Sequence, residues 1–111
     1  MVAERVGNQA ERDFRAALAI DPTYDKALQN LGLVYARRGD YSTALVTLTR
    51  VVGAPMAAND VGYIAMISGD YAAADRLFQD AIRLSPRYYP TANENAAELR
   101  RRRNGAAVAA Q

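Results

Sequence analysis

The acidic residues that could take part in acid–base catalysis form two close pairs. Asp75 and Asp80 are five residues apart, and Glu94 and Glu98 are four residues apart. Positioned carboxylates can transfer protons, but the sequence has no His, no Cys and no glycine-rich phosphate loop to accompany them. We interpret both pairs as solvated helix faces. The protein is therefore expected to be a non-enzyme with no catalytic residue, no metal ligand and no cofactor.

The basic residues gather near the C-terminus, where residues 83–111 hold six Arg and two Glu. Four Arg are consecutive, at residues 100–103, and clustered Arg can contact the phosphates of a nucleic acid or of an anionic membrane. No aromatic residue interleaves them, and a helix dipole favours cations at the C-terminal end. We expect no nucleic-acid partner. Two interpretations stay open: a solvated helix end, or a docking site for an anionic protein or membrane surface.

The composition is that of a globular protein, since 50% of the 111 residues are hydrophobic and 23% are charged. No apolar run reaches the roughly eighteen residues needed to cross a bilayer. The N-terminal sequence also lacks the apolar core of a secretory signal. The chain itself therefore indicates no targeting signal.

Two stretches of the sequence nearly repeat each other, and the helices that they predict would position all of these side chains. Residues 37–48 read RRGDYSTALVTL, and residues 67–78 read ISGDYAAADRLF. A third, partial copy lies 34 residues upstream of the first, around Phe14. The large residues recur at helical spacing in each copy. We predict helix-turn-helix hairpins, with helices at about residues 8–20, 24–38, 41–52, 56–68, 71–84 and 89–103.

Glycine and aspartate mark the turn of each hairpin. Gly39 and Gly69 suit the left-handed end of a first helix, and the aspartate that follows each of them suits the start of the second helix. Small residues should lie where the two antiparallel helices approach closely. These small residues are Gly32 and Ala44 in one hairpin and Gly62 and Ala74 in the other.

The combined pattern resembles the tetratricopeptide repeat (TPR). The resemblance is carried by LGLVYARRGDYSTAL at residues 31–45, followed by Leu48, Val51 and Pro55, and by VGYIAMISGDYAAADRLFQDAIRLSP at residues 61–86. It implies an all-α fold in which TPR helix-turn-helix repeats form a short right-handed solenoid with a C-terminal capping helix. The implied segments are the second helix of a truncated TPR at 1–22, TPRs at 23–55 and 56–87, the capping helix at 88–104 and a flexible tail at 105–111.

The sequence departs from the family pattern at three places. The step from Ala44 to Ala74 is 30 residues rather than 34, so we expect a tight connection around Gly53 and Pro55 and a local change of curvature. Ala65 occupies the position of the family's tyrosine in the first helix. The chain also opens in mid-repeat, which suggests self-association through an uncovered face at Phe14 and Leu18.

TPR proteins typically bind a peptide or a partner helix in a concave groove lined by the first helix of each repeat. By the family register, the implied groove residues are Lys26, Gln29, Leu33, Arg37, Met56, Asn59, Tyr63, Met66, Asn93 and Arg100. We expect the partner segment to have apolar anchors and a slightly acidic character. In the alternative interpretation, Met56, Met66 and Ile67 are core residues between repeats. A clamp for a C-terminal carboxylate is excluded, since Met56 and Asp60 stand where basic residues are needed.

Two shorter stretches carry a narrower resemblance, VGYIAMISGDY at residues 61–71 and LSPRYYPTANEN at residues 84–95. These stretches are similar to the C-terminal repeats of TadD-like proteins of the tight-adherence (Flp) pilus system. That resemblance implies a bacterial scaffold, periplasmic or outer-membrane-associated, with pilus or secretin components as partners. The other hypothesis is a general TPR adaptor, cytoplasmic in that case, whose basic C-terminal helix docks on an anionic protein or membrane surface.

Overall fold

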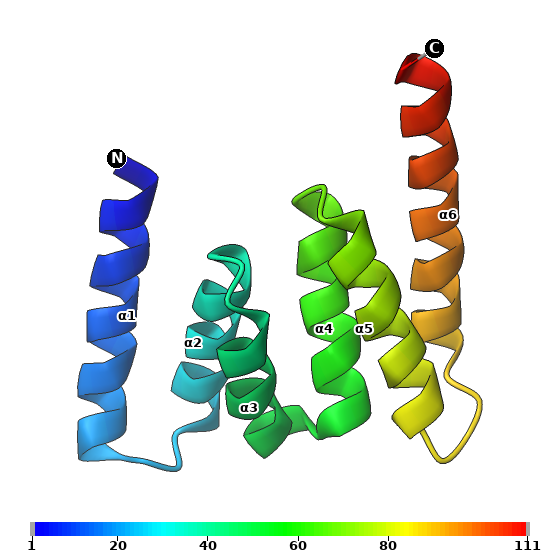
Figure 1. The fold of residues 1–111 in the computed structure, drawn as a ribbon. Helices are drawn as coiled ribbons and strands as arrows, with labels where there is room; N and C mark the ends of the chain where they lie inside the picture. Colours follow the sequence, from blue (N-terminus) through cyan, green and yellow to red (C-terminus); the bar gives the residue numbers. More distant parts are fainter. Residues whose placement is uncertain (1, 111) are drawn as a thin grey trace. The chain divides into compact units, whose positions relative to one another are not determined.

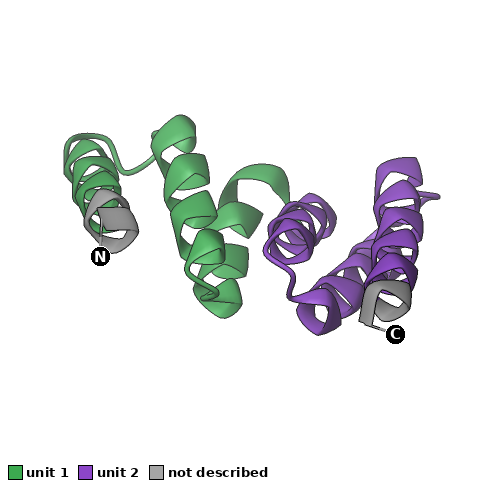
Figure 2. Cartoon of the chain, turned by 90° about the horizontal axis from the view of Figure 1, so that it is seen from above, with its two compact units in different colours: residues 1–53 green, residues 54–111 purple. Residues whose placement is uncertain are grey.

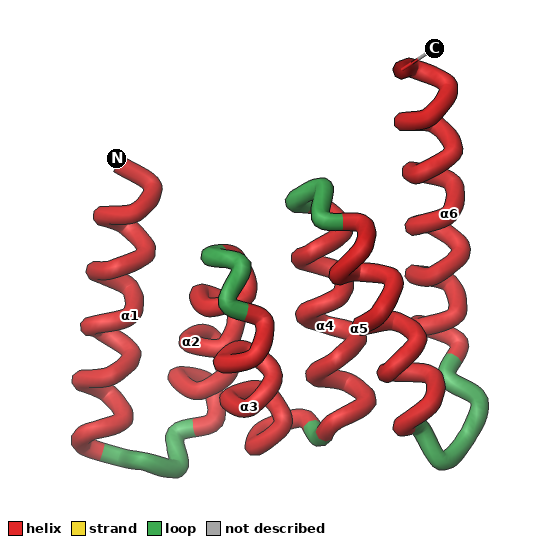
Figure 3. Tube along the Cα trace, viewed as in Figure 1, coloured by secondary structure: helices red, strands yellow, loops and turns green. Residues whose placement is uncertain are grey.

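The computed structural model describes the backbone of residues 2–110 and the side chains of residues 8–106. The described residues form six helices and no strand (Figures 1 and 3). The helices are α1 (Val2–Ile20), α2 (Asp25–Arg37), α3 (Tyr41–Val52), α4 (Ala54–Ile67), α5 (Tyr71–Leu84) and α6 (Pro90–Ala110). The chain divides into two compact units, unit 1 (Met1–Gly53) and unit 2 (Ala54–Gln111) (Figure 2). The expected all-α fold of helical hairpins is confirmed.

Unit 1 is a hairpin of α2 and α3 with α1 packed against α2. Gly39 ends the first helix with a φ of 83°, a left-handed conformation that glycine adopts without a Cβ clash. The Asp40 side chain then accepts a hydrogen bond of 3.3 Å from the backbone N–H of Thr43, which caps the start of α3. The helices approach closely at Gly32, where an added Cβ would lie 2.5 Å from Leu48 Cγ.

Unit 2 repeats this hairpin with α4 and α5, and α6 packs against both helices. Gly69 has a φ of 85°, and the Asp70 side chain accepts a hydrogen bond of 3.2 Å from the backbone N–H of Ala73. At Gly62, an added Cβ would lie 2.8 Å from Phe78 Cε1. The largest fully buried side chains of the unit are Phe78, Met66, Leu99 and Val61. The two predicted glycines, Gly32 and Gly62, therefore lie where the helices of each hairpin approach closely, and the predicted alanines, Ala44 and Ala74, are fully buried.

Helix boundaries differ from the prediction mainly at the two ends of the chain. α1 begins at Val2 rather than near residue 8. α6 continues to Ala110, so the helix does not end at residue 104 as predicted. The physical reason is the alanine-rich sequence after Gly105, since alanine has the highest helix propensity. No described helix is both long enough and apolar enough to cross a membrane.

The connection between α3 and α4 is a single residue, Gly53, with a φ of 84°. Pro55 lies in the first turn of α4, where a missing N–H leaves no helical hydrogen bond unmade. The tight connection predicted around these two residues is confirmed. The expected change of curvature stays a prediction.

Candidate functional site

Large apolar side chains are exposed along one side of α4 in unit 2. The exposed fractions are 46% for Met56, 46% for Tyr63 and 53% for Ile67. These residues and Asp60 are separated by four, three and four positions, which places them on one helix face at 3.6 residues per turn. We call Met56, Asp60, Tyr63 and Ile67 the α4 face. By contrast, Val61 and Ile64 of the same helix are buried.

Asp60 is the charged member of the α4 face. Its side chain is half-buried, and burial raises the pKa of its carboxyl above the ordinary value because the charged form loses hydration. Tyr89, at the approach to α6, lies close enough for the negative charge of Asp60 to add to the effect of burial in raising the pKa of the Tyr89 hydroxyl. Within the described part of the chain, Asp60 has no hydrogen bond and no ion pair. The face therefore combines apolar area with one carboxylate that lacks a counter-charge.

Two residues predicted to contact a partner are instead buried. Met66 is 1% exposed, and Asn59 is 5% exposed. The side-chain oxygen of Asn59 accepts a hydrogen bond of 2.9 Å from Asn95 Nδ2 on α6. Both residues lie at one flank of the α4 face, about 40° (Asn59) and about 60° (Met66) around the helix from Tyr63, and packing rather than rotation alone covers them. Neither Met66 nor Asn59 is therefore accessible to a partner in this structure, and a binding role for either residue stays a prediction.

The alternative interpretation placed Met56, Met66 and Ile67 in the core between repeats. Met66 is buried within unit 2, whereas Met56 and Ile67 are about half exposed. The sequence pattern could not separate them, because all three are large apolar residues on one short helix. Asn95 was missed altogether. One feature of the sequence could have indicated it. Asn95 aligns with Val61 of the preceding repeat, so a polar residue occupies a position that is apolar there.

The two predicted site residues on α6, Asn93 and Arg100, are both at least partly exposed. Asn93 is half-buried, and its Nδ2 donates a hydrogen bond of 2.9 Å to the backbone oxygen of Tyr89, one turn earlier. Arg100 is exposed. Nothing in these contacts assigns either residue a binding role, and their place in a partner site stays a prediction.

The remaining arginines of the basic run have partners inside unit 2. Arg101 and Arg102 both bind the carboxylate of Glu98, at 2.7 Å and 3.1 Å. Hydrogen bonds from the Arg101 and Arg102 side chains lower the pKa of Glu98. Arg103 donates a hydrogen bond of 3.1 Å to the backbone oxygen of Tyr71 at the start of α5. Because α6 continues to Ala110, the run lies inside the helix rather than at its end. The contacts agree with a solvated run of arginines, three of which have partners within the unit.

The corresponding residues of unit 1 form a face of different chemistry on α2. Lys26, Gln29 and Arg37 are exposed, and Leu33 is half-buried. Two cations thus flank one aliphatic side chain. The predicted site residues of α2 are therefore accessible, but they offer less apolar area than the α4 face.

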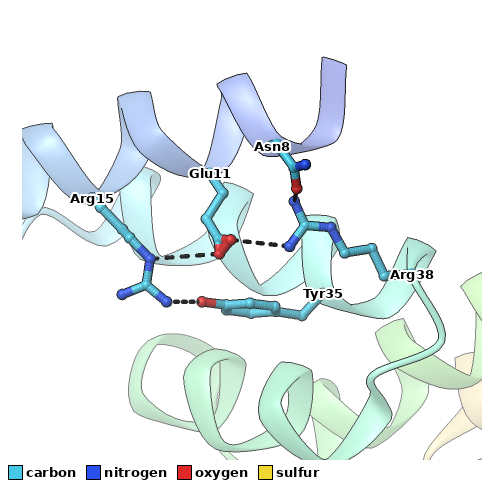
Figure 4. Close-up of polar contacts among 5 residues, drawn as sticks. All are labelled: Asn8, Glu11, Arg15, Tyr35 and Arg38. Carbon is cyan, nitrogen blue, oxygen red and sulfur yellow. Dashed lines mark hydrogen bonds and ion pairs between the residues drawn. The ribbon is translucent and has the colours of Figure 1, made fainter. Parts of the chain in front are cut away.

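Unit 1 also contains a polar cluster that the sequence analysis did not predict (Figure 4). Arg38 at the end of α2 donates hydrogen bonds to Glu11 Oε1 at 3.0 Å and to Asn8 Oδ1 at 2.9 Å. Arg15 forms an ion pair with Glu11 and a hydrogen bond with the Tyr35 hydroxyl. The Arg38 hydrogen bond is the main cause of a lowered pKa at Glu11. The cluster joins α1 to α2 (Figure 4).

The α1 residues Phe14 and Leu18, which we expected to form an uncovered apolar face, are both half-buried. The described exposed residues of α1 are mostly polar or small, including Gln9, Arg12 and Ala16. Self-association through this end of the chain stays a prediction.

Comparisons with known proteins agree with the repeat pattern. Two family models, each described as a tetratricopeptide repeat, match residues 14–46 and residues 57–88. The first match begins inside α1, runs through α2 and ends inside α3, and the second covers most of α4 and all of α5. Together they span more than half of the chain. No curated protein matches the sequence.

Proposed function

This chain is a tetratricopeptide-repeat protein, built of modules that serve as scaffolds for protein–protein interaction, and we propose that its α4 face is the docking site for an apolar segment of a partner protein. One observation carries this proposal. Three large apolar side chains, Met56, Tyr63 and Ile67, are each about half exposed on one side of a helix whose other sides are packed.

Covering this face would be favourable. Removing the remaining exposed area of each of the three side chains from water contributes roughly 1 kcal/mol. Tyr63 can add a hydrogen bond through its hydroxyl, and Met56 can adapt to partners of different shape. A peptide or helix with matching apolar side chains is therefore the class of ligand that the face fits.

The biological setting that we propose is the assembly of a bacterial tight-adherence (Flp) pilus. Its support is the similarity of residues 61–71 and 84–95 to TadD-like proteins. In that setting the protein would act in the periplasm or at the outer membrane, and the partner would be a secretin or another pilus-assembly component. Both of these stretches lie in unit 2, which also contains the α4 face.

Photo-crosslinking in cells tests this proposal. A photoreactive amino acid replaces Tyr63 in the full-length protein, and mass spectrometry identifies what is captured. The matched control places the same probe at Gln79, an exposed position on α5. Specific capture of a pilus-assembly protein at Tyr63 but not at Gln79 is the expected result. Capture only of proteins unrelated to pili would remove the pilus setting, and equal capture at both positions would remove the binding role of the face.

A further inference from the structure

Asp60 lies in the middle of the α4 face rather than at its edge. It follows Met56 by four positions and precedes Tyr63 by three and Ile67 by seven. The side chain is half-buried, so nearby protein atoms already exclude part of its hydration. Any partner segment that covers both Met56 and Ile67 must also pass over this carboxylate.

Unit 2 supplies no counter-charge to Asp60 among its described residues. Arg83 pairs with Asp80, and Arg101 and Arg102 pair with Glu98 instead. Other acidic residues are partnered, such as Glu11 with Arg38 and Asp70 with the N–H of Ala73. Asp75 of α5 is also half-buried without such a partner, but it lies outside the α4 face. Asp60 is thus the acidic residue that combines partial burial, a place on the α4 face and no side-chain hydrogen bond or ion pair among the described residues.

A purely apolar segment would be a poor ligand for this face. Docking would remove the remaining water from the carboxylate, and an ionised group that is buried without a partner is strongly destabilising. The raised pKa of Asp60 shows that this cost is already felt in the free protein. A cation on the partner would offset the loss of hydration through a charge-assisted hydrogen bond to the carboxylate.

We propose that the segment recognised by the α4 face carries a Lys or Arg side chain between its apolar anchors, and that this cation pairs with Asp60. The inference rests on the proposed function of the face and specifies the chemistry of its ligand. It reverses the sequence-based expectation of a slightly acidic segment. The aligned residue of unit 1 is the neutral Asn30, so unit 1 offers no carboxylate at this position of its repeat.

The test uses the Tyr63 photo-probe in the full-length protein, in cells, in four forms: otherwise native, Asp60→Lys, Asp60→Asn and Asp75→Lys. Asp75 is the matched control, because it is a half-buried aspartate on α5 of the same unit. The readouts are the yield of the specific crosslink and the sequence of the captured peptide. Circular dichroism of each purified variant confirms that it is folded.

The inference predicts a captured peptide that contains Lys or Arg, with a crosslink yield at least about tenfold lower in Asp60→Lys and unchanged in Asp75→Lys. The nearly isosteric Asp60→Asn should give a smaller loss and should keep the fold even if the lysine variant does not. Replacing the partner's basic residue with Glu should then restore capture by Asp60→Lys.

The inference fails if the captured peptide has no basic residue, or if both Asp60 variants crosslink as well as Asp75→Lys does. Those outcomes leave the docking role of the face intact. If the otherwise native protein captures nothing beyond what a probe at Gln79 captures, the proposed function itself fails, and this result is seen before any Asp60 variant is compared.

Discussion

The buried side-chain oxygen of Asn59 accepts a hydrogen bond of 2.9 Å from Asn95 Nδ2, so one amide pair joins α4 to α6. The two residues are 36 positions apart in the sequence. This contact removes Asn59 from the set of residues that a partner could reach.

We predict that Asn95→Ala destabilises unit 2 by about 1–3 kcal/mol, because it leaves the buried oxygen of Asn59 without its hydrogen bond. The measurement is the free energy of unfolding from urea denaturation, followed by circular dichroism. Glu94→Ala, a change at the exposed neighbouring position, should alter that free energy by less than about 0.5 kcal/mol. Equal effects of the two substitutions would show that the amide pair contributes nothing.

Glycine substitutions should have opposite effects at two positions of unit 2. Gly62→Ala should destabilise the protein by about 1–3 kcal/mol, because its Cβ would lie 2.8 Å from Phe78 Cε1 and force the ring to move. Gly105→Ala meets nothing within 4 Å and should stabilise α6 by up to about 1 kcal/mol. Thermal melting of the two variants checks both signs. An unchanged melting temperature for Gly62→Ala would contradict the close packing of α4 and α5.

The turn and the packing of each hairpin could be predicted because local sequence determines them. At each turn a glycine with positive φ ends one helix and the aspartate that follows it caps the next, as Gly39 and Asp40 do. Both effects involve only residues that are close in the sequence. The position of Gly32 opposite Leu48 follows from the helical period once the turn is known.

The contacts that were missed join residues far apart in the sequence. Arg38 and Glu11 are 27 positions apart, and each could equally well have faced solvent. The same ambiguity explains why the burial of Met66 was not predicted, since a methionine on an apolar helix can be either core or surface until its neighbours are placed. The face of α4 that stays exposed depends on where α5 and α6 pack, and periodicity within α4 does not determine that.

The Glu11 cluster should make unit 1 sensitive to acid. The pKa of Glu11 lies below its ordinary value of 4.5 in the folded protein, mainly because Arg38 hydrogen-bonds its ionised form. A group with a lowered pKa stabilises the fold above about its ordinary pKa, and that contribution is lost as the pH falls through the folded value. Native protein should therefore be more stable than Glu11→Gln at neutral pH, and the difference should shrink below pH 4.5.

The measurement for Glu11 is the free energy of unfolding of both proteins across this pH range. Asp13→Asn serves as the control, because Asp13 is exposed on the same helix. A difference between native and Glu11→Gln protein that stays constant with pH would show that the charge of Glu11 does not stabilise the fold.

Replacing Arg101, Arg102 and Arg103 together with Gln should leave partner binding unchanged. All three arginines already bind groups within unit 2, and none belongs to the α4 face. The measurement is capture by the Tyr63 photo-probe at low and at moderate salt. A large loss of capture in a folded variant, together with steep salt dependence in the native protein, would instead favour an adaptor that docks through its basic C-terminal helix.

The central claim is that the α4 face binds the partner, and its most direct measurement is the affinity of the full-length protein for the protein captured at Tyr63. The test compares the native chain with a Tyr63→Ser, Ile67→Ser double variant, and uses Val46→Ser, a change at a 68% exposed position on α3, as the control. We predict a loss of affinity of at least about tenfold for the double variant, with an unchanged melting temperature, and no loss for the control. Native affinity in the folded double variant would contradict the claim.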